Sequence, residues 1–148
     1  MLEISLDTSQ LDRGLSQLLR NTTDLRPMMR AIATEMTSLT EDNFETESWG
    51  GQRWQRSIRA NSEGGKTLQK SGQLAASIST KVGNDFARIG SNKKYAAIHH
   101  MGGNAGRGHS LNLPARPYLP ISGNGMLQTG ADKSILDIAI KSLAKGLA

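Results

Sequence analysis

Apolar and polar residues alternate at the start of the chain, where Leu2, Ile4 and Leu6 are separated by Glu3 and Ser5. This period of two predicts a β-strand with one buried face. The apolar spacing becomes helical after Asp-Thr-Ser at 7–9, residue types that cap helix N-termini. It predicts a first helix whose apolar face consists of Leu11, Leu15, Leu18 and Leu19.

A second and longer helix is predicted to begin at Thr23 or Asp24, because either side chain can accept a hydrogen bond from a free amide of the first turn. Pro27 fits that first turn, where a missing amide hydrogen leaves no helical bond unmade. The apolar side of this helix is predicted to consist of Leu25, Met28, Met29, Ile32, Met36, Leu39 and Phe44.

Gly50 and Gly51 interrupt the helical pattern, because a glycine inside a helix costs about 1 kcal/mol relative to alanine. Residues 48–54 are therefore predicted to form a turn that carries two tryptophans. We assign Trp54 to the core, and Trp49 to either the core or an exposed interface, where tryptophan is enriched. The basic and polar residues from 56 to 70 are predicted to be a long, partly flexible loop.

Alternating residues on both sides of Gly-Asn-Asp at 83–85 predict strands at 74–82 and 86–90 that form a hairpin. Residues 95–100 fit a single helical turn, and the extended pieces at 111–113 and 118–121 are expected to add to the same sheet. A C-terminal amphipathic helix is predicted from about Met126 or Thr129. Its apolar stripe consists of Ile135, Leu136, Ile138, Ala139, Ile140 and Leu143.

The whole pattern predicts one α+β domain covering residues 1–148. A small, mostly antiparallel sheet has the long N-terminal helices and the C-terminal helix packed on one face. Flexible loops are expected at about 50–70 and 101–113. Because only 36% of the residues are hydrophobic and six are aromatic, the core should be modest and built mainly from Leu, Ile, Met and Ala.

The composition narrows the chemistry that the chain can perform. It contains no cysteine, which excludes disulfides and thiolate metal sites. No stretch approaches the ~20 apolar residues of a membrane span, and the first residues lack the basic region and apolar run of a signal peptide. We therefore expect a protein that is made in the cytosol and has no membrane partner.

Charge is distributed unevenly along the chain. Residues 1–50 carry four arginines and nine acids, residues 51–100 carry nine bases and two acids, and the remainder carries five bases and two acids. The three segments therefore net −5, +7 and +3. This asymmetry indicates either an anionic partner or charge-matched contact between copies of the chain. The alternative is that the charged side chains are simply exposed to water and have no partner.

His99, His100 and His109 lie close together in sequence, but neighbouring histidines do not share a face of a helix or strand. No acid lies between Asp85 and Asp132 to complete a metal shell, so we predict no metal site. The glycine-rich run at 102–108 leads into Leu-Asn-Leu-Pro, unlike a phosphate-binding loop, which opens a helix. The neighbouring His109 and Ser110 lack an orienting acid, and we predict that the chain is not an enzyme.

A small basic nucleic-acid-binding protein is the alternative function. The basic middle of the chain combines positive charge with Trp49, Trp54 and Tyr95, whose rings can stack on bases. No helix-turn-helix, zinc or RNA-binding signature accompanies these residues.

Five short segments, taken in order, resemble one known family. They are Gly-Gln-Arg-Trp at 51–54, Lys-Thr-Leu-Gln-Lys-Ser-Gly-Gln-Leu at 66–74, the short strand ending at Gly90, Tyr-Ala-Ala-Ile-His-His-Met-Gly at 95–102, and Leu-Pro-Ala-Arg-Pro-Tyr-Leu at 113–119. Together they resemble the virion morphogenesis proteins of tailed bacteriophages, the Mu-like tail completion or head–tail joining family. The resemblance covers about residues 40–120.

The resemblance implies a structural phage or prophage protein that completes the tail and enables head–tail joining at the tail's head-proximal end. It implies no enzymatic activity and no cofactor. The expected partners are phage tail and head or neck proteins, and copies of the chain, monomeric when isolated, are expected to form a ring that contacts the end of the packaged DNA. The expected location is the host cytoplasm during assembly and then the neck or tail end of the virion.

The candidate partner-interface residues are Arg53, Trp54, Lys66, His99, Arg107, Arg116 and Tyr118. Pro114 and Pro117 restrict the backbone around Arg116, so the segment 113–119 is predicted to be stiff and to present Arg116 and Tyr118 to a partner. Trp54, His99 and Arg116 have a structural alternative, in which they hold the fold instead.

Overall fold

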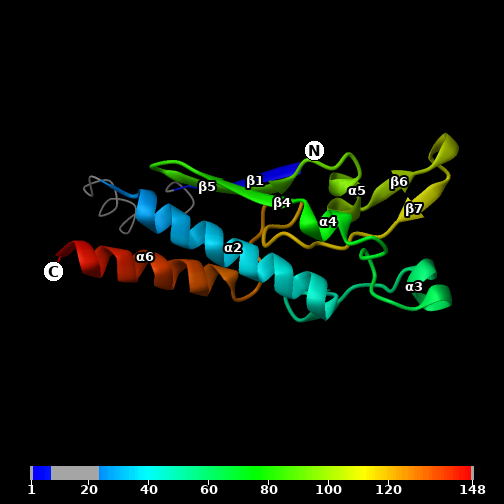
Figure 1. Cartoon of the computed structure of the whole chain (residues 1–148), viewed down its shortest axis with the longest axis horizontal. Helices are drawn as coiled ribbons and strands as arrows, with labels where there is room; N and C mark the ends of the chain where they lie inside the picture. The colour runs from blue at the N-terminus through cyan, green and yellow to red at the C-terminus, as the bar shows by residue number, and fades with distance from the viewer. Residues whose placement is uncertain (1, 8–23, 148) are drawn as a thin grey trace.

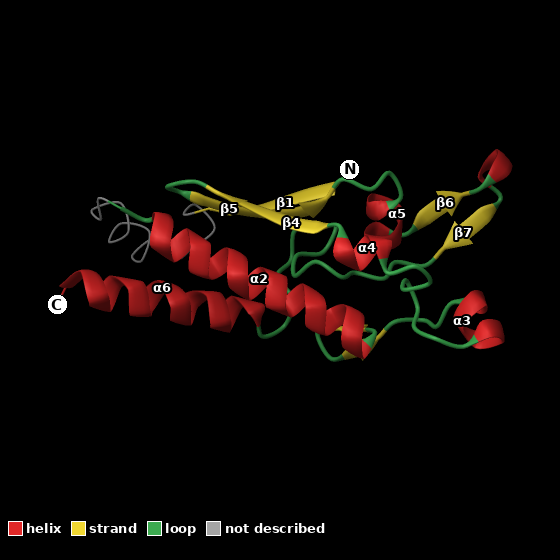
Figure 2. Cartoon of the chain, in the orientation of Figure 1, coloured by secondary structure: helices red, strands yellow, loops and turns green. Residues whose placement is uncertain are grey.

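A computed structural model describes residues 2–7 and 24–147, so the helix predicted on residues 11–19 lies outside the described residues. Figures 1 and 2 show a small sheet on one side of two long helices, and a group of short elements at the end away from the C-terminus. The elements are β1 (Leu2–Asp7), α2 (Arg26–Thr46), β2 (Ser48–Trp49), β3 (Gln52–Arg53), α3 (Ile58–Glu63), α4 (Gln73–Ala76), β4 (Ile78–Val82), β5 (Phe86–Ser91), α5 (Ala96–Met101), β6 (Gly103–Ala105), the 3-10 turn η2 (Arg107–His109), β7 (Leu111–Leu113) and α6 (Ala131–Leu147). This is an α+β fold, as predicted.

Three antiparallel strands form the main sheet in the order β1-β5-β4. In its register Leu2 and Ile78 both lie opposite Ser91, on the two sides of β5. The predicted N-terminal strand and the predicted hairpin around residues 83–85 are therefore confirmed. Leu6 and Ile89 are buried against the helices, as the period-two pattern requires of the inner face.

Helix α2 packs against β4 and β5 and supplies much of the core. Its buried apolar residues are Met28, Met29, Ile32, Ala33, Met36 and Phe44, a stripe with helical spacing. Pro27 lies in the first turn, as predicted, but Leu25 occupies the N-cap position and its side chain cannot cap. The carboxylate of Asp24 accepts a hydrogen bond from the Arg26 amide at 3.1 Å instead.

The C-terminal helix α6 begins at Ala131, later than the predicted start at 126 or 129. It packs along α2, and Ala131, Ile135 and Ala139 are its fully buried residues among those described. Leu136 and Ile140, which the apolar stripe included, are exposed. The stripe predicted from sequence is therefore wider than the face that α2 covers.

The prediction of a long, partly flexible loop at 56–70 is wrong for residues 58–63, which form α3. Ser57 caps this helix by accepting a hydrogen bond from the Ala60 amide at 3.1 Å, and Gly64 ends it. The remainder of the segment is bonded to the fold, because Thr67 is buried and its amide donates to the Glu47 carboxylate at 2.7 Å. A Ser directly before this polar helix and a Gly directly after it were the local signals available in the sequence.

Two strand predictions are also corrected. Residues 73–76 form the short helix α4, because Leu-Ala-Ala favours a helix once Gly72 has turned the chain at φ 72°, and the strand begins only at Ile78. Residues 111–113 form β7 as predicted, but β7 pairs with β6 in a separate hairpin rather than joining the main sheet. This hairpin occupies part of the loop expected at 101–113. Residues 118–121 make only an isolated bridge, between Ile121 and Leu127.

Candidate functional site

The segment 114–121, named the return segment below, belongs to no helix or strand, yet every residue from 116 to 121 is buried or half-buried. Its carbonyls from 117 to 121 each accept a hydrogen bond from a different residue. The donors, in that order, are Trp54 Nε1, Asn43 Nδ2, Trp49 Nε1, the Gln128 amide and His100 Nε2. Since a buried carbonyl without a donor is costly, these donors replace a partner strand.

His100 is a structural residue that the sequence analysis did not single out. Its Nε2 bonds to the Ile121 carbonyl oxygen at 2.8 Å, and its Nδ1 accepts from the amides of Tyr118 and Leu119 at 3.2 and 3.4 Å. This arrangement requires the neutral ring with its proton on Nε2, because a carbonyl only accepts. Burial lowers the pKa of His100, and the bond to Ile121 opposes that shift.

The return segment does not present Tyr118 at the surface, contrary to the prediction. Tyr118 is fully buried, stacks on Phe44 at 5.1 Å between ring centroids, and donates its hydroxyl hydrogen to the Ala96 carbonyl at 2.6 Å. Burial raises the pKa of this phenol above its usual range. The physical reason is the packing of the return segment between α2 and α5, which turns Tyr118 inward.

Trp54 also lies in the core, as predicted, with 8% of its surface exposed. Its indole nitrogen donates to the Pro117 carbonyl at 2.8 Å. Trp49, which the sequence left open, is half-buried and donates to the Leu119 carbonyl at 2.8 Å. Both tryptophans therefore attach the β2–β3 hairpin to the return segment.

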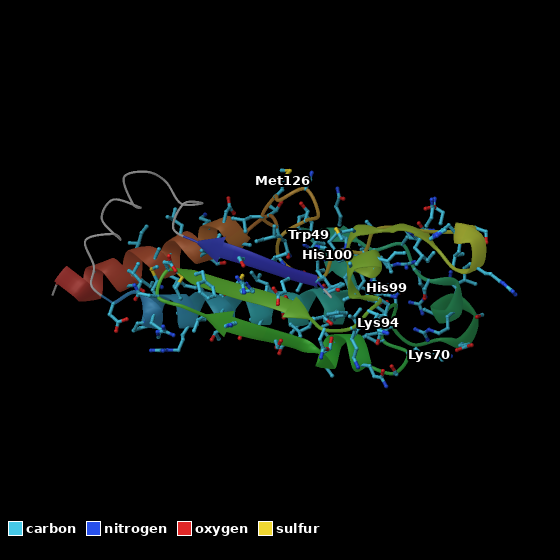
Figure 3. All side chains as sticks on the ribbon, turned by 90° about the horizontal axis from the view of Figure 1, so that it is seen from above. Trp49, Lys70, Lys94, His99, His100 and Met126 are labelled. Carbon is cyan, nitrogen blue, oxygen red and sulfur yellow. The ribbon has the colours of Figure 1, made fainter. Side chains whose placement is uncertain are left out.

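His99 and Arg116 meet in a pocket of about 360 Å³, named the cationic pocket below. Three of the family-like segments supply most of its lining: 66–74, 95–102 and 113–119. Figure 3 shows Lys70 and His99 at the end of the molecule away from the C-terminus, where this pocket lies. Its lining includes the basic side chains of Arg59, Lys70 and Arg116, the apolar side chains of Leu68, Leu74 and Leu113, and the rings of Tyr95 and His99.

The cationic pocket contains three basic side chains and no carboxylate among its lining residues. Arg116 is held in place by a bond from its Nε to the Gln55 carbonyl at 2.8 Å. Burial lowers the pKa of His99, and the positive charge of Arg116 lowers it further. His99 also has a buried Nδ1 without a hydrogen-bond partner among the described residues. The pocket therefore has unbalanced positive charge.

The other candidates lie outside this pocket. Arg53 in β3 and Arg107 in η2 are exposed. Lys66 forms an ion pair with Glu45 at 2.7 Å and also donates to the Glu45 carbonyl at 3.0 Å, which ties the 64–70 segment to α2. Their role at an interface stays a prediction.

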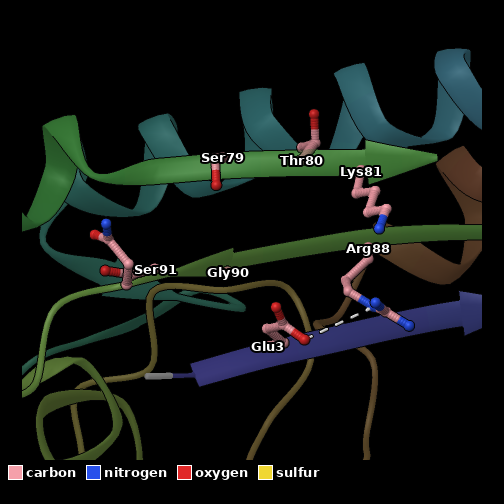
Figure 4. Close-up of a pocket in the computed structure, with 8 residues that line it drawn as sticks. Glu3, Ser79, Thr80, Lys81, Arg88, Gly90 and Ser91 are labelled. Atoms are coloured by element: carbon pink, nitrogen blue, oxygen red, sulfur yellow. Dashed lines mark ion pairs between the residues drawn. The ribbon is translucent and has the colours of Figure 1, made fainter.

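The outer face of the main sheet forms a second, polar surface, shown in Figure 4. Glu3 and Arg88 form an ion pair across β1 and β5 at 3.9 Å, and Lys81 lies on the neighbouring strand. An exposed pair of this length contributes little stability. This surface carries no apolar patch comparable with the wall of the cationic pocket.

We predict that Arg116→Ala lowers the free energy of unfolding by about 1–3 kcal/mol, because the Gln55 carbonyl loses its donor and a side chain only 5% exposed leaves its site. Unfolding should remain cooperative. Chemical denaturation followed by tryptophan fluorescence measures the change, with the exposed Arg107→Ala as the control. Equal stability of the two variants would assign Arg116 to partner contact alone.

In the part of the chain that is described, no three His, Asp or Glu side chains are placed to hold a metal ion. None of the described helices combines the length and apolar character of a membrane-spanning helix. The fold and the pocket define a small α+β protein whose candidate site is built from cations and apolar side chains, a combination suited to binding.

The chain belongs to the phage virion morphogenesis family, whose family model matches residues 6–144. It is 38% identical to "Mu-like prophage FluMu G protein 2" of Haemophilus influenzae over 80% of this chain and 83% of that protein. It is 32% identical to "Putative capsid assembly protein G" of Escherichia phage Mu over 99% of this chain and 96% of that protein. No solved structure is significantly similar to it. The chain is thus a bacteriophage-type protein of virion morphogenesis.

Proposed function

We propose that this protein completes the phage tail and makes its head-proximal end competent to join a head. Membership of the virion morphogenesis family supports an assembly role. The observation that carries the proposal is the convergence of three family-like segments on one cationic pocket. The fold brings residues that are far apart in sequence together in one binding surface. Such a surface indicates a protein that acts by contacting partners.

The distribution of charge supports contact between copies as part of this function. Glu41, Asp42 and Glu45 are exposed on the C-terminal half of α2. Lys70, between α3 and α4, and Arg107 in η2 are exposed as well. The acidic surface of one copy can contact the basic surface of the next copy, head to tail. Such contacts close into a ring when the rotation between neighbouring copies brings the last copy back to the first. In the virion we place the ring at the neck, with basic side chains near the end of the packaged DNA.

The tryptophan positions do not favour the nucleic-acid-binding alternative. Stacking on bases requires exposed aromatic faces. Trp54 is buried and Trp49 is half-buried, and both indole nitrogens are bonded to carbonyls of the return segment. Tyr95, which is 40% exposed, is the most exposed member of the proposed stacking set.

Disruption of the gene in a producing strain tests the function. Negative-stain electron microscopy of the lysate is expected to show full heads and normal-length tails that are separate. A plasmid copy of the intact gene should restore joined particles, which controls for effects on neighbouring genes. Intact infectious particles without the gene would reject the proposal, and empty or absent heads would place the protein at an earlier step.

A further inference from the structure

We infer that the cationic pocket binds an acidic peptide of a partner protein. A carboxylate of the peptide binds the basic side chains of the pocket, and a neighbouring apolar side chain of the peptide fills the apolar part of the pocket. The inference deepens the proposed function by naming the chemistry of the partner. It rests on that function only for the statement that the partner is a virion protein.

Arg116 is oriented for a carboxylate before any ligand arrives. Its Nε is bonded to the Gln55 carbonyl at 2.8 Å, and its backbone amide donates to the His99 carbonyl at 2.9 Å. Among the described residues neither terminal nitrogen of its guanidinium has a hydrogen-bond acceptor. A fixed guanidinium with free terminal nitrogens can bind a carboxylate with little loss of side-chain entropy.

Two further cations increase the positive potential of the pocket. Arg59 donates to the Lys66 carbonyl at 2.6 Å and to the Gly64 carbonyl at 3.4 Å, which holds its charge at the pocket. It forms no ion pair among the described residues. Lys70 is exposed and forms no ion pair within the described structure. Because no carboxylate lines the pocket, an anion from outside would be the first to balance these charges.

The apolar part of the lining favours a peptide over a nucleic acid. The apolar part of the lining is Leu68, Leu74, Leu113 and Tyr95. A volume of about 360 Å³ holds one or two side chains. A duplex, in contrast, binds along a row of exposed cations that follows its phosphates, and it has no apolar group to place against three leucines.

His99 provides an internal reporter of binding. Its buried Nδ1 makes no hydrogen bond within the described structure, and its neighbours in the pocket are Arg59, Lys70, Tyr95 and Arg116. Arg116 and burial hold the pKa of His99 below its ordinary value. A bound carboxylate would offset the charge of Arg116, so the pKa should rise on binding and affinity should increase as the pH falls from 7.5 to 6.

Titration of the full chain with a synthetic peptide, acetyl-Leu-Glu-Glu-Leu-Glu-amide, tests the inference by calorimetry and by NMR of the histidine rings. Binding should be at least tenfold tighter than for the same peptide with glutamine in place of glutamate. Lys70→Gln should weaken binding about twofold to fivefold, the range of an exposed ion pair. Lys94→Gln is the matched control, because Lys94 is exposed but does not line the pocket.

Three results would overturn the inference: equal affinity for the glutamine peptide, binding without any shift of the His99 resonances, or no binding at millimolar peptide. A DNA duplex that displaces the peptide and binds more tightly, with a steep salt dependence, would assign the pocket to nucleic acid instead. The gene-disruption experiment does not involve the pocket. Failure of the peptide test therefore leaves the joining function standing, and failure of the joining function leaves peptide binding measurable.

Discussion

Replacing Gly102 with alanine is expected to lower the free energy of unfolding by about 2–6 kcal/mol, a large part of the 5–15 kcal/mol typical of a domain. Gly102 ends α5 at φ 74° and ψ 176°, a region that is essentially restricted to glycine. An added Cβ would also lie 2.7 Å from the Ala115 nitrogen and 3.0 Å from the Leu113 oxygen. The substitution would therefore push the return segment away from α5.

Gly64→Ala is the matched control for this prediction. Gly64 ends α3 at φ 81° and ψ −175°, almost the same conformation, but an added Cβ there would meet nothing within 4 Å. The Gly64→Ala substitution should lower the free energy of unfolding by about 1–3 kcal/mol, the cost of the backbone strain alone. The midpoints of urea denaturation compare the two variants. If both variants lose the same free energy of unfolding, the return segment does not approach Gly102 as closely as described.

The second large effect is expected at His100, whose replacement by asparagine should lower stability at pH 7.5 by about 1–3 kcal/mol. The asparagine oxygen can accept a bond from the Tyr118 or Leu119 amide, as Nδ1 of the ring does, but the Ile121 carbonyl loses its donor. The same substitution should reduce the dependence of stability on pH, because a titrating group is removed.

The sign of this pH dependence follows from the lowered pKa of His100 in the folded chain. An unfolded histidine titrates near 6.5, so below that pH the unfolded chain binds more protons than the folded one. The wild-type protein should therefore keep its full stability above about pH 7 and lose it progressively as the pH falls through 6.5. His99, whose pKa is also lowered, should leave a smaller decline in the His100→Asn variant.

Denaturant midpoints measured from pH 7.5 to 5.5 test this expectation. His109→Asn is the control, since His109 is exposed and asparagine accepts its positive φ of 54°. This control should follow the wild-type curve. A His100→Asn variant whose stability falls with pH as steeply as that of the wild type would show that His100 is not the buried neutral ring described above.

The elements that the sequence predicted are those with a sustained hydrophobic period. The alternation at Leu2, Ile4 and Leu6 and the helical spacing in α2 each persist long enough to identify one face. The helical turn predicted at 95–100 is confirmed by α5, whereas the short helices α3 and α4 were missed because single capping residues determine them. Ser57 begins α3 and Gly72 precedes α4, and such local signals compete with loop and strand alternatives until tertiary contacts decide.

The candidate site was only partly predictable for a different reason. Two adjacent histidines on α5 point about 100° apart, so one can face the core and the other a pocket. Which histidine faces the core depends on the position of the return segment, and the spacing of the residues in the sequence does not predict that position. The same holds for Arg116 and Tyr118: the prolines predicted a stiff segment, but only its bonds to Trp54, Asn43 and Trp49 bury Tyr118.

The return segment connects the stability of the fold to the proposed function. His99 and Arg116 line the cationic pocket. His100, which follows His99, bonds to Tyr118, which lies two residues after Arg116, and this bond holds the return segment in the interior. The family-like segments at 95–102 and 113–119 therefore combine structural and binding residues. Variants that alter binding without altering stability must be chosen from exposed positions such as Lys70.

In vitro complementation tests the central claim, a late action that joins finished heads to finished tails, most directly. Purified protein is added to a lysate of the strain with the disrupted gene, after protein synthesis has been stopped, and infectious particles are counted. We predict that the wild-type protein restores infectious particles and that the destabilised Gly102→Ala variant does not. Failure of the wild-type protein to restore them, while a gene copy expressed during infection succeeds, would contradict late action and place the protein in an earlier assembly step.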